Sequence, residues 1–240
     1  STQSRSSAAS DVYKRQTLGQ GFSAAAADAT TSEEEVEINF AKALQMSLYF
    51  YDANKCGSGI TGGNLEWRGD CHTEDAAVPL KPMGEDYKGT NLSQKFIDAH
   101  RDILDPDGDG TIDVAGGMHD AGDHVKFCLP GSYAASTLGW GYYEFRDAYV
   151  DSGQQWHIED ILHWFNDYYL KCTYFDENGD ILAFCYQVGE GDIDHNYWNA
   201  PELQNESLLD FARPAYFATV ETPASDMCAG CLLYTSPSPR

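Results

Sequence analysis

The sequence predicts a mainly helical domain whose helices are joined by long loops. Apolar residues recur at helical spacing in three segments, and a stretch rich in Gly, Pro and Asp, from residue 57 to residue 131, separates the first segment from the other two. A loop region of this length within a compact domain is usually functional. Because 240 residues can bury a substantial core, we expect one domain with its stability in the helices and its function in the loops.

The predicted elements are three helices and one hairpin. The first helix begins near Ser32, a capping residue followed by acidic residues, and ends near Cys56. The second spans 134–149, and the third spans 155–171 with an apolar face wide enough for a buried helix. A turn at 177–180 between two short extended runs predicts the hairpin. The apolar stripes comprise Phe40, Leu44, Leu48 and Tyr51; Leu138, Tyr142, Phe145 and Tyr149; and Ile158, Ile161, Leu162, Phe165, Tyr168 and Tyr169.

The composition limits the partners that the chain can have. Its 15 basic and 38 acidic residues give a formal net charge of −23, which argues against nucleic acid or an anionic membrane, since both attract a basic face. The charge is compatible with a neutral polysaccharide and with divalent cations. Because the chain has no apolar run of about 18 residues, we expect no membrane span. Seven cysteines leave at least one unpaired, and a disulfide between Cys172 and Cys185 could bridge the predicted hairpin turn.

The most informative stretch is 116–127, which holds two aspartates, Asp120 and Asp123, each next to a histidine. The Ala-Gly pair between them suits a tight turn in which both carboxylates face one cavity. Such a pair can position and deprotonate a water molecule, or it can bind a metal. The alternative is a solvated acidic turn. Apolar and aromatic flanks, which are unusual for a simple surface loop, favour a functional site; they are Val125, Phe127, Leu129, Tyr133 and Trp140.

This stretch, together with the segments 132–141 and 144–149 behind it, resembles glycoside hydrolase family 9, the inverting β-1,4-glucanases that are mostly cellulases. A second block, 186–202, is similar to the same family at the expected distance downstream. The resemblance covers roughly residues 38–227. It implies an all-α (α/α)6 barrel, of which this chain would hold the N-terminal portion with long active-site loops. It also implies a secreted, monomeric endoglucanase that acts on β-1,4-glucan or cello-oligosaccharides.

The resemblance implies that Asp123 is the catalytic base and that Asp120 helps to hold the attacking water. An inverting glycosidase needs a base and an acid on opposite faces of the sugar, about 6.5–9.5 Å apart, which leaves room for that water. The base must stay ionised, so a polar, partly wet loop suits it. His195 and Trp198 match family positions that contact glucose rings on the non-reducing side of the cut. The alternative for both is core packing.

The general acid of the family has no match in this sequence. In the family it is a glutamate close to the C-terminus of a catalytic domain about twice this length. Glu144, Glu190 and Glu202 lie in matched blocks where the family's acid does not sit, and we assign none of them to that role. We therefore expect the N-terminal part of an enzyme domain, inactive by itself. The alternatives are a non-catalytic carbohydrate-binding remnant and a metal-binding structural module.

Four further residues form a candidate zinc site: Cys56, Cys71, His72 and His119. Two thiolates and two imidazoles make a closed tetrahedral structural site. Some family members carry such a zinc, and the resemblance extends to these ligands residue for residue, although the spacing is not the linear C-x-x-C type. The metal would hold three loops together and support Asp120. The alternatives are a Cys56–Cys71 disulfide and unrelated free thiols.

A candidate calcium loop precedes the aspartate pair. Asp105, Asp107 and Asp109 take the first, third and fifth positions of an EF-hand-like loop, with Gly at the sixth position and an apolar residue at the eighth. Gly116, however, stands at the twelfth position, where an EF-hand has a bidentate Glu, and flanking helices are not evident. The alternative is a solvated acidic turn.

The two ends differ from the rest of the chain. Residues 1–16 and 231–240 resemble translated sequencing adapter, and we exclude both from the fold. Residues 17–35 are expected to be a linker or the remnant of a signal peptide. Residues 36–230 are expected to form the N-terminal part of the catalytic domain.

Overall fold

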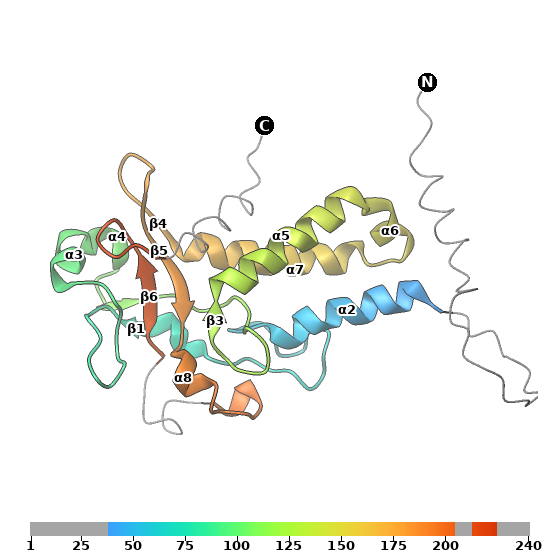
Figure 1. The fold of residues 1–240 in the computed structure, drawn as a ribbon, viewed down its shortest axis with the longest axis horizontal. Coiled ribbons are helices and arrows are strands. Elements are labelled where there is room, and N and C mark those ends of the chain that lie inside the picture. Colours follow the sequence, from blue (N-terminus) through green and yellow to red (C-terminus); the bar gives the residue numbers. More distant parts are fainter. Residues whose placement is uncertain (1–37, 205–212, 225–240) are drawn as a thin grey trace, which may run out of the picture. The chain divides into compact units, whose positions relative to one another are not determined.

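The structure, a computed structural model, describes residues 38–204 and 213–224 of the chain (Figure 1). The chain divides into a short leading unit, Ser1–Ala41, and a body, Lys42–Arg240, and the fold described below is that of the body. The predicted helix start at Ser32, the predicted linker and the two predicted adapter-derived ends lie outside the described residues.

Three long helices make up most of the helical structure in the described residues. They are α2, Phe40–Asn54; α5, Cys128–Glu144; and α7, Gln155–Lys171; a short helix, α6, Arg146–Asp151, lies between α5 and α7 (Figure 1). The third predicted helix has the bounds that the sequence indicated. The helix predicted for 134–149 instead begins at Cys128 and is interrupted at Phe145, whose backbone leaves helical geometry with φ −122° and ψ 33°.

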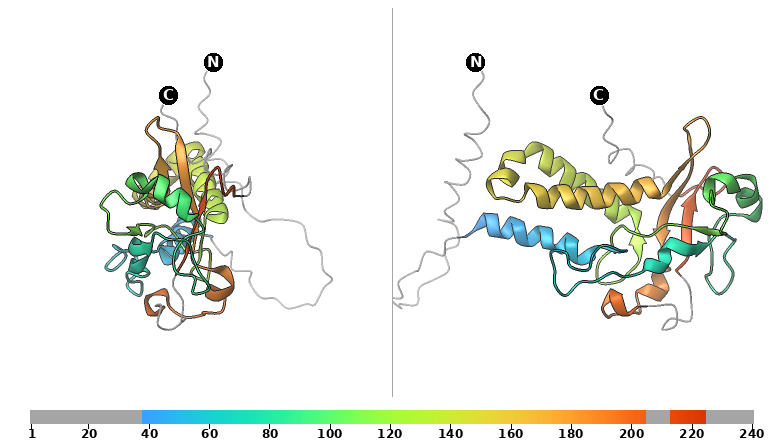
Figure 2. Two further views of the ribbon diagram at one scale, coloured as in Figure 1. Left: turned by 90° about the vertical axis from the view of Figure 1, so that its left-hand side faces the viewer. Right: turned by 180° about the vertical axis from the view of Figure 1, so that it is seen from behind.

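The three helices share an apolar core. α5 and α7 run side by side in both views (Figures 1 and 2) and pack against each other. α2 contacts α7 where the ring of Tyr51 lies 6.3 Å from the ring of Phe165. Ile158 and Ile161 of α7 are fully buried, as its wide apolar face predicts. Burial of each such side chain contributes about 1.5–3 kcal/mol, so the apolar face of α7 contributes substantially to the stability of this core.

A small antiparallel sheet lies at the end of the helices where α5 begins and α7 ends (Figure 2). Its strands are β3, Lys126–Phe127; β4, Thr173–Phe175; β5, Ile181–Val188; and β6, Ala215–Ala218. β4 and β5 form the predicted hairpin, and β5 pairs with all three other strands. The sequence did not predict β6. The all-α class is therefore too narrow, because the fold is mostly helical with a sheet beside the helices.

The segment between α2 and α5 is mostly loop, as predicted, but short elements interrupt it. The strand β1 pairs with β2, and Ser93 caps α3 by accepting a hydrogen bond from the N–H of Phe96 at 3.1 Å. The short elements here and after β5 are η1, Thr73–Ala77; β1, Val78–Pro79; α3, Gln94–Ala99; α4, Arg101–Leu104; β2, Thr111–Ile112; α8, Gly191–Asp194; and η2, Pro201–Leu203.

Two predictions about covalent and membrane features can be compared with the structure. Cys172 and Cys185 are buried neighbours, and the N–H of Cys185 donates to the carbonyl of Cys172 at 2.9 Å, yet both thiols are free, so the predicted disulfide is not formed. Among the described residues, none of the helices has the length and apolarity that crossing a bilayer requires.

Asp75 joins the loops to the sheet through two buried cations. Its side chain is fully buried; Oδ1 lies 2.9 Å from Nε of Arg213, and Oδ2 lies 2.9 Å from Nζ of Lys126. Burial alone would raise the pKa of Asp75, but the charges of Arg213 and Lys126 outweigh it and lower the pKa to about 2. Removing one partner of such a buried group leaves the others uncompensated.

We expect Asp75→Asn to lower the free energy of unfolding by about 3–5 kcal/mol, because Lys126 and Arg213 would lose their shared charge partner in the interior. Urea unfolding followed by circular dichroism measures the change. The matched control is Asp98→Asn, which removes an exposed carboxylate 3.4 Å from Arg101 and should cost about 0.5 kcal/mol or less. Equal losses in the two variants would contradict the role of Asp75.

The same group predicts the acid sensitivity of the fold. Because the folded-state pKa of Asp75 is about 2, below the ordinary value of 3.8, its contribution is present above pH 3.8 and is lost as the pH falls towards 2. The linked loss is about 2 kcal/mol. Stability measured between those pH values should fall less steeply in Asp75→Asn than in the unaltered chain.

Candidate active site and metal cluster

The turn that carries the two aspartates is fixed at both ends. The N–H of Asp120 donates to the carbonyl of Val125 at 2.9 Å, which closes the turn on itself. Just before it, the N–H of His119 donates to the carbonyl of Asn54 at 2.8 Å, which ties the loop to the end of α2. The turn is thus held by backbone hydrogen bonds that do not depend on the aspartate side chains.

Lys126 and Tyr168 fix the position of the loop before the aspartate turn relative to α7. The ammonium of Lys126 is buried and donates to the carbonyls of Val114 at 2.6 Å and Gly116 at 3.1 Å, and it lies 4.9 Å from the ring centre of Tyr168. Gly117 has φ +77°, and a Cβ there would lie 2.7 Å from Cδ1 of Tyr168. Only glycine combines that backbone conformation with this close approach.

The two carboxylates differ in exposure. Asp120 is exposed, whereas Asp123 is 4% exposed. Loss of surrounding water raises the pKa of Asp120, the charge of Asp123 raises it further, and His195 opposes both effects. Nε2 of His195 lies 2.7 Å from Oδ2 of Asp123, a contact that is an ion pair when the imidazole is protonated. The fold therefore brings the two family-like sequence blocks into direct contact.

Trp198 lies over the same turn from the other block. Its side chain is 74% exposed, and a Cβ on Gly122 would lie 2.8 Å from Cζ3 of the indole. Trp198 is therefore not packed in the core of the described residues. The side chain of His195 is about half exposed, so both residues present polar or aromatic surface beside Asp123.

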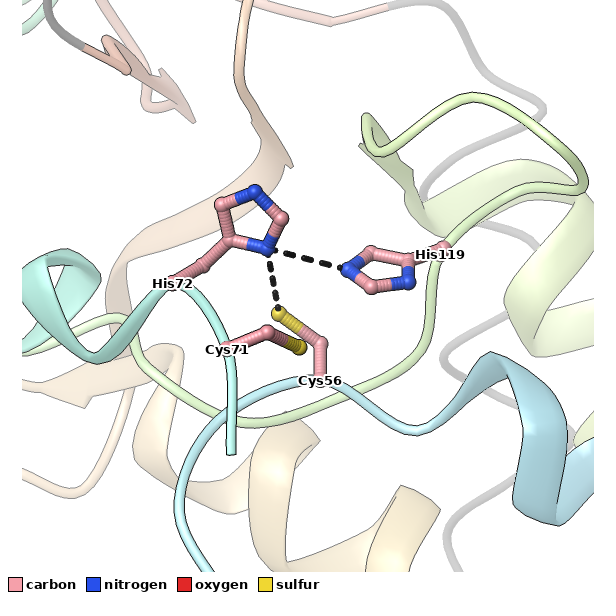
Figure 3. A group of neighbouring side chains, drawn as sticks. All are labelled: Cys56, Cys71, His72 and His119. Carbon is pink, nitrogen blue, oxygen red and sulfur yellow. Dashed lines mark hydrogen bonds between the residues drawn. The ribbon is translucent and has the colours of Figure 1, made fainter. Parts of the chain in front are cut away.

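The four candidate zinc ligands form one buried cluster. Their ligand atoms, one from each residue, all lie within 4.8 Å of one another, and every side chain is buried. Nδ1 of His72 lies 3.8 Å from Sγ of Cys56 and 3.2 Å from Nε2 of His119 (Figure 3). Both thiols are free, so the Cys56–Cys71 disulfide is not formed. Two sulfurs and two ring nitrogens that converge in this way fit a tetrahedral metal ion.

The protonation of the cluster also fits a metal site. Burial raises the pKa of Cys56, while a hydrogen bond from Cys56 lowers the pKa of Cys71. Burial, and the nearby ring of His72, lower the pKa of His119 well below its usual value, which keeps this imidazole neutral. A neutral imidazole offers the lone pair that a metal requires.

The structure also brings together the three aspartates of the candidate calcium loop. Carboxylate oxygens of Asp105, Asp107 and Asp109 lie within 4.8 Å of one another. Asp105 is buried and its Oδ2 accepts from the N–H of Gly110 at 3.1 Å, whereas Asp107 and Asp109 are exposed. The helices α3 and α4 precede the loop, but β2 follows it, so it is not a complete EF-hand. The calcium site stays a prediction.

The three glutamates that we did not assign as the general acid lie outside the aspartate turn. Glu202 is bound by Arg68, with 2.7 Å between Oε1 and Nε, and by the N–H of Gly69 at 2.8 Å. Glu190 accepts from the hydroxyl of Tyr216, and Glu144 is the exposed last residue of α5.

Gln204 and Arg213 are residues of the site that sequence reasoning missed. The amide of Gln204 contacts His72 and Asp194, and Arg213 lies 3.1 Å from Asp194 and donates to the carbonyl of His124 at 2.8 Å. Both residues are polar and buried, so each needs hydrogen-bond partners. No sequence pattern indicated that they would be buried.

We expect Gly117→Ala to destabilise the fold by about 1–3 kcal/mol more than Gly179→Ala, because its Cβ would meet the ring of Tyr168. Gly179, at φ +84°, has nothing within 4 Å of its Cβ position, so it reports the backbone cost alone. Thermal unfolding of both variants measures the difference. If both lose the same stability, Tyr168 does not set the position of the loop.

The chain matches a known family over most of its length. Residues 40–232 match glycosyl hydrolase family 9. Endoglucanase A of Bacillus pumilus is 30% identical over 202 residues, which are 84% of this chain and 24% of that protein. The catalytic domain of CelT from Clostridium thermocellum is 52% identical, with a TM-score of 0.73, and the match covers 82% of this chain and 39% of that domain.

A second solved relative was obtained with sugars. CelQ from Clostridium thermocellum, solved with cellobiose and cellotriose, is 29% identical, with a TM-score of 0.54, over 83% of this chain and 26% of that chain. The chain thus spans about a quarter of the length of its curated relative and under two fifths of the CelT domain. Its mostly helical fold matches part of these (α/α)6-barrel structures. The chain belongs to glycosyl hydrolase family 9 and corresponds to part of the catalytic domain of the family's endoglucanases.

Proposed function

We propose that this chain contributes the catalytic base and part of the sugar-binding surface of an inverting endo-β-1,4-glucanase. The observation that supports this most directly is the 2.7 Å contact between Asp123 and His195, residues from two separate family-like blocks. The substrate is cellulose or a related β-glucan, in line with the cello-oligosaccharides bound to CelQ.

Asp123 is the group that takes the proton from the attacking water. Its side chain is buried, and its Oδ2 lies 2.7 Å from Nε2 of the half-exposed His195. Asp120 is exposed beside it and accepts a second hydrogen bond from the same water, which orients the lone pair towards the anomeric carbon. Loss of surrounding water, and then the charge of Asp123, raise the pKa of Asp120, and a bound water that donates to both carboxylates would offset part of this repulsion.

His195 and Trp198 hold the sugar. The exposed indole of Trp198 offers a flat face that suits the apolar C–H face of a glucose ring. Close packing of the indole against Gly122 fixes its position relative to the turn. His195 exchanges its contact with Asp123 for a sugar hydroxyl when substrate binds, which leaves the base free to accept the water proton.

The buried cluster of Cys56, Cys71, His72 and His119 would hold a zinc ion with a structural role. Because His119 immediately precedes Asp120, an ion bound there would fix the start of the catalytic turn. All four side chains are buried and all four positions are protein ligands, so no coordination position is left for a substrate. The ion would supply rigidity and not Lewis-acid chemistry.

The test of the catalytic proposal uses a complete catalytic domain, in which this chain replaces the matching part of the CelT domain. The unsubstituted chimera should hydrolyse soluble cellulose, and the first product seen by proton NMR should be the α-anomer. Asp123→Asn should lower kcat by about 10²–10⁴-fold, because the general base is lost, with little change in cellotetraose affinity.

Asp151→Asn is the matched control, since it removes an exposed carboxylate at the end of α6 and should leave kcat unchanged. Full turnover by the Asp123→Asn chimera would rule out Asp123 as the base. An active chimera that yields the β-anomer first would rule out inversion.

The metal proposal predicts one zinc ion per chain in protein purified without chelators, measured by plasma mass spectrometry. Cys56→Ala should lower the zinc content, because the site loses one of its four protein ligands. Cys128→Ala, which removes another buried thiol outside the cluster, should keep it. A zinc content in Cys56→Ala equal to that of the unaltered chain would show that the cluster is not the binding site.

A non-catalytic carbohydrate-binding role is the second candidate, favoured by the exposure of Trp198 beside the turn. Calorimetric titration of this chain with cellotetraose distinguishes the two. Binding that depends on Trp198, together with an inactive chimera, would favour the binding role.

A further inference from the structure

Gln204 joins the two parts of the site through one side-chain amide. It is buried and directly follows η2. Its Oε1 lies 3.0 Å from Nε2 of His72 and also contacts Nδ1 of His124. Its Nε2 donates to Oδ1 of Asp194. One amide therefore contacts a residue of the metal cluster, the residue after Asp123, and the residue before His195.

Asp194 determines which way the amide points. A carboxylate paired with a guanidinium only accepts hydrogen bonds, and Oδ2 of Asp194 already lies 3.1 Å from Nη1 of Arg213. The NH₂ group of Gln204 must therefore face Asp194. Its carbonyl oxygen then faces the two imidazoles, and the opposite orientation would set an acceptor against a buried carboxylate.

The direction of the amide in turn determines the tautomer of His72. Because the oxygen of Gln204 cannot donate, His72 must carry a proton on Nε2. In the neutral ring this leaves the lone pair on Nδ1. Nδ1 is the atom that points to Sγ of Cys56 and to Nε2 of His119 (Figure 3).

We propose that Gln204 is a positioning residue that holds His72 in the tautomer and ring orientation a metal ion needs. The same oxygen also accepts from His124, so the amide links the metal cluster to the segment of the catalytic base. This inference rests on the proposed zinc site. Loss of such an outer hydrogen bond typically weakens metal binding by about 10–100-fold.

The test compares zinc affinity, measured by competition with a chromophoric chelator, in the full chain and in three variants. Gln204→Leu has a similar volume but no acceptor, and it should weaken zinc binding by about 10–100-fold. Gln154→Leu is the matched control, because Gln154 is also buried and its Oε1 lies 3.2 Å from Nδ1 of His157, away from the cluster. It should leave zinc affinity unchanged.

Gln204→Glu separates positioning from general packing. Glutamate keeps an acceptor oxygen for His72 and His124, so most of the zinc affinity should return. Its second oxygen would face Asp194, so the melting temperature should fall below that of the unaltered chain. A visible spectrum of the cobalt-loaded chain that changes in Gln204→Leu and not in Gln154→Leu would support the same conclusion without any measurement of activity.

Two results would overturn the inference while leaving the zinc site intact. One is a Gln204→Leu chain that binds zinc as tightly as the unaltered chain. The other is equal weakening in Gln204→Leu and Gln154→Leu, which would indicate a general loss of stability. If the unaltered chain binds no zinc, the metal site and the role of Gln204 fail together.

Discussion

Asp75 holds two buried cations at once, and each cation fixes a different part of the backbone around the site. Lys126 donates to the carbonyls of Val114 and Gly116, in the loop that leads to the aspartate turn. Arg213 binds Asp194 and the carbonyl of His124. Because a buried carboxylate is stable only when such partners are present, the loop, the turn and the second sequence block must form together. Their mutual dependence explains how long loops can hold a defined geometry.

In the aspartate turn, each aspartate is the direct sequence neighbour of a buried histidine. His119 lies in the buried cluster, and Asp120 follows it directly at the surface. His124 contacts Gln204, and Asp123 precedes it next to His195. The buried residues His119 and His124 are thus the direct neighbours of Asp120 and Asp123 in the turn. Asp120 is thus exposed at the surface, although the backbone on either side of it is anchored by hydrogen bonds.

Sequence reasoning predicted the elements whose signal is local. α7 has a repeated apolar face, and the hairpin has a turn between two extended runs, so both were found. β6 is four residues long and is defined by pairing with β5, which no local pattern reveals. The aspartate turn and the metal cluster came from family-like motifs. Gln204 was missed because a buried amide is recognised only by its partners, which lie in three other segments.

The contacts that complete the site join residues very far apart in the chain. Arg68 reaches Glu202 across 134 positions, and Arg213 reaches Asp75 across 138. Contacts of such separation form late in folding, since the entropy of closing a long loop must be overcome before they add stability. The helices can therefore assemble first while the active-site region stays open. On a ribosome, this region would acquire its shape only after residue 213 had left the exit tunnel.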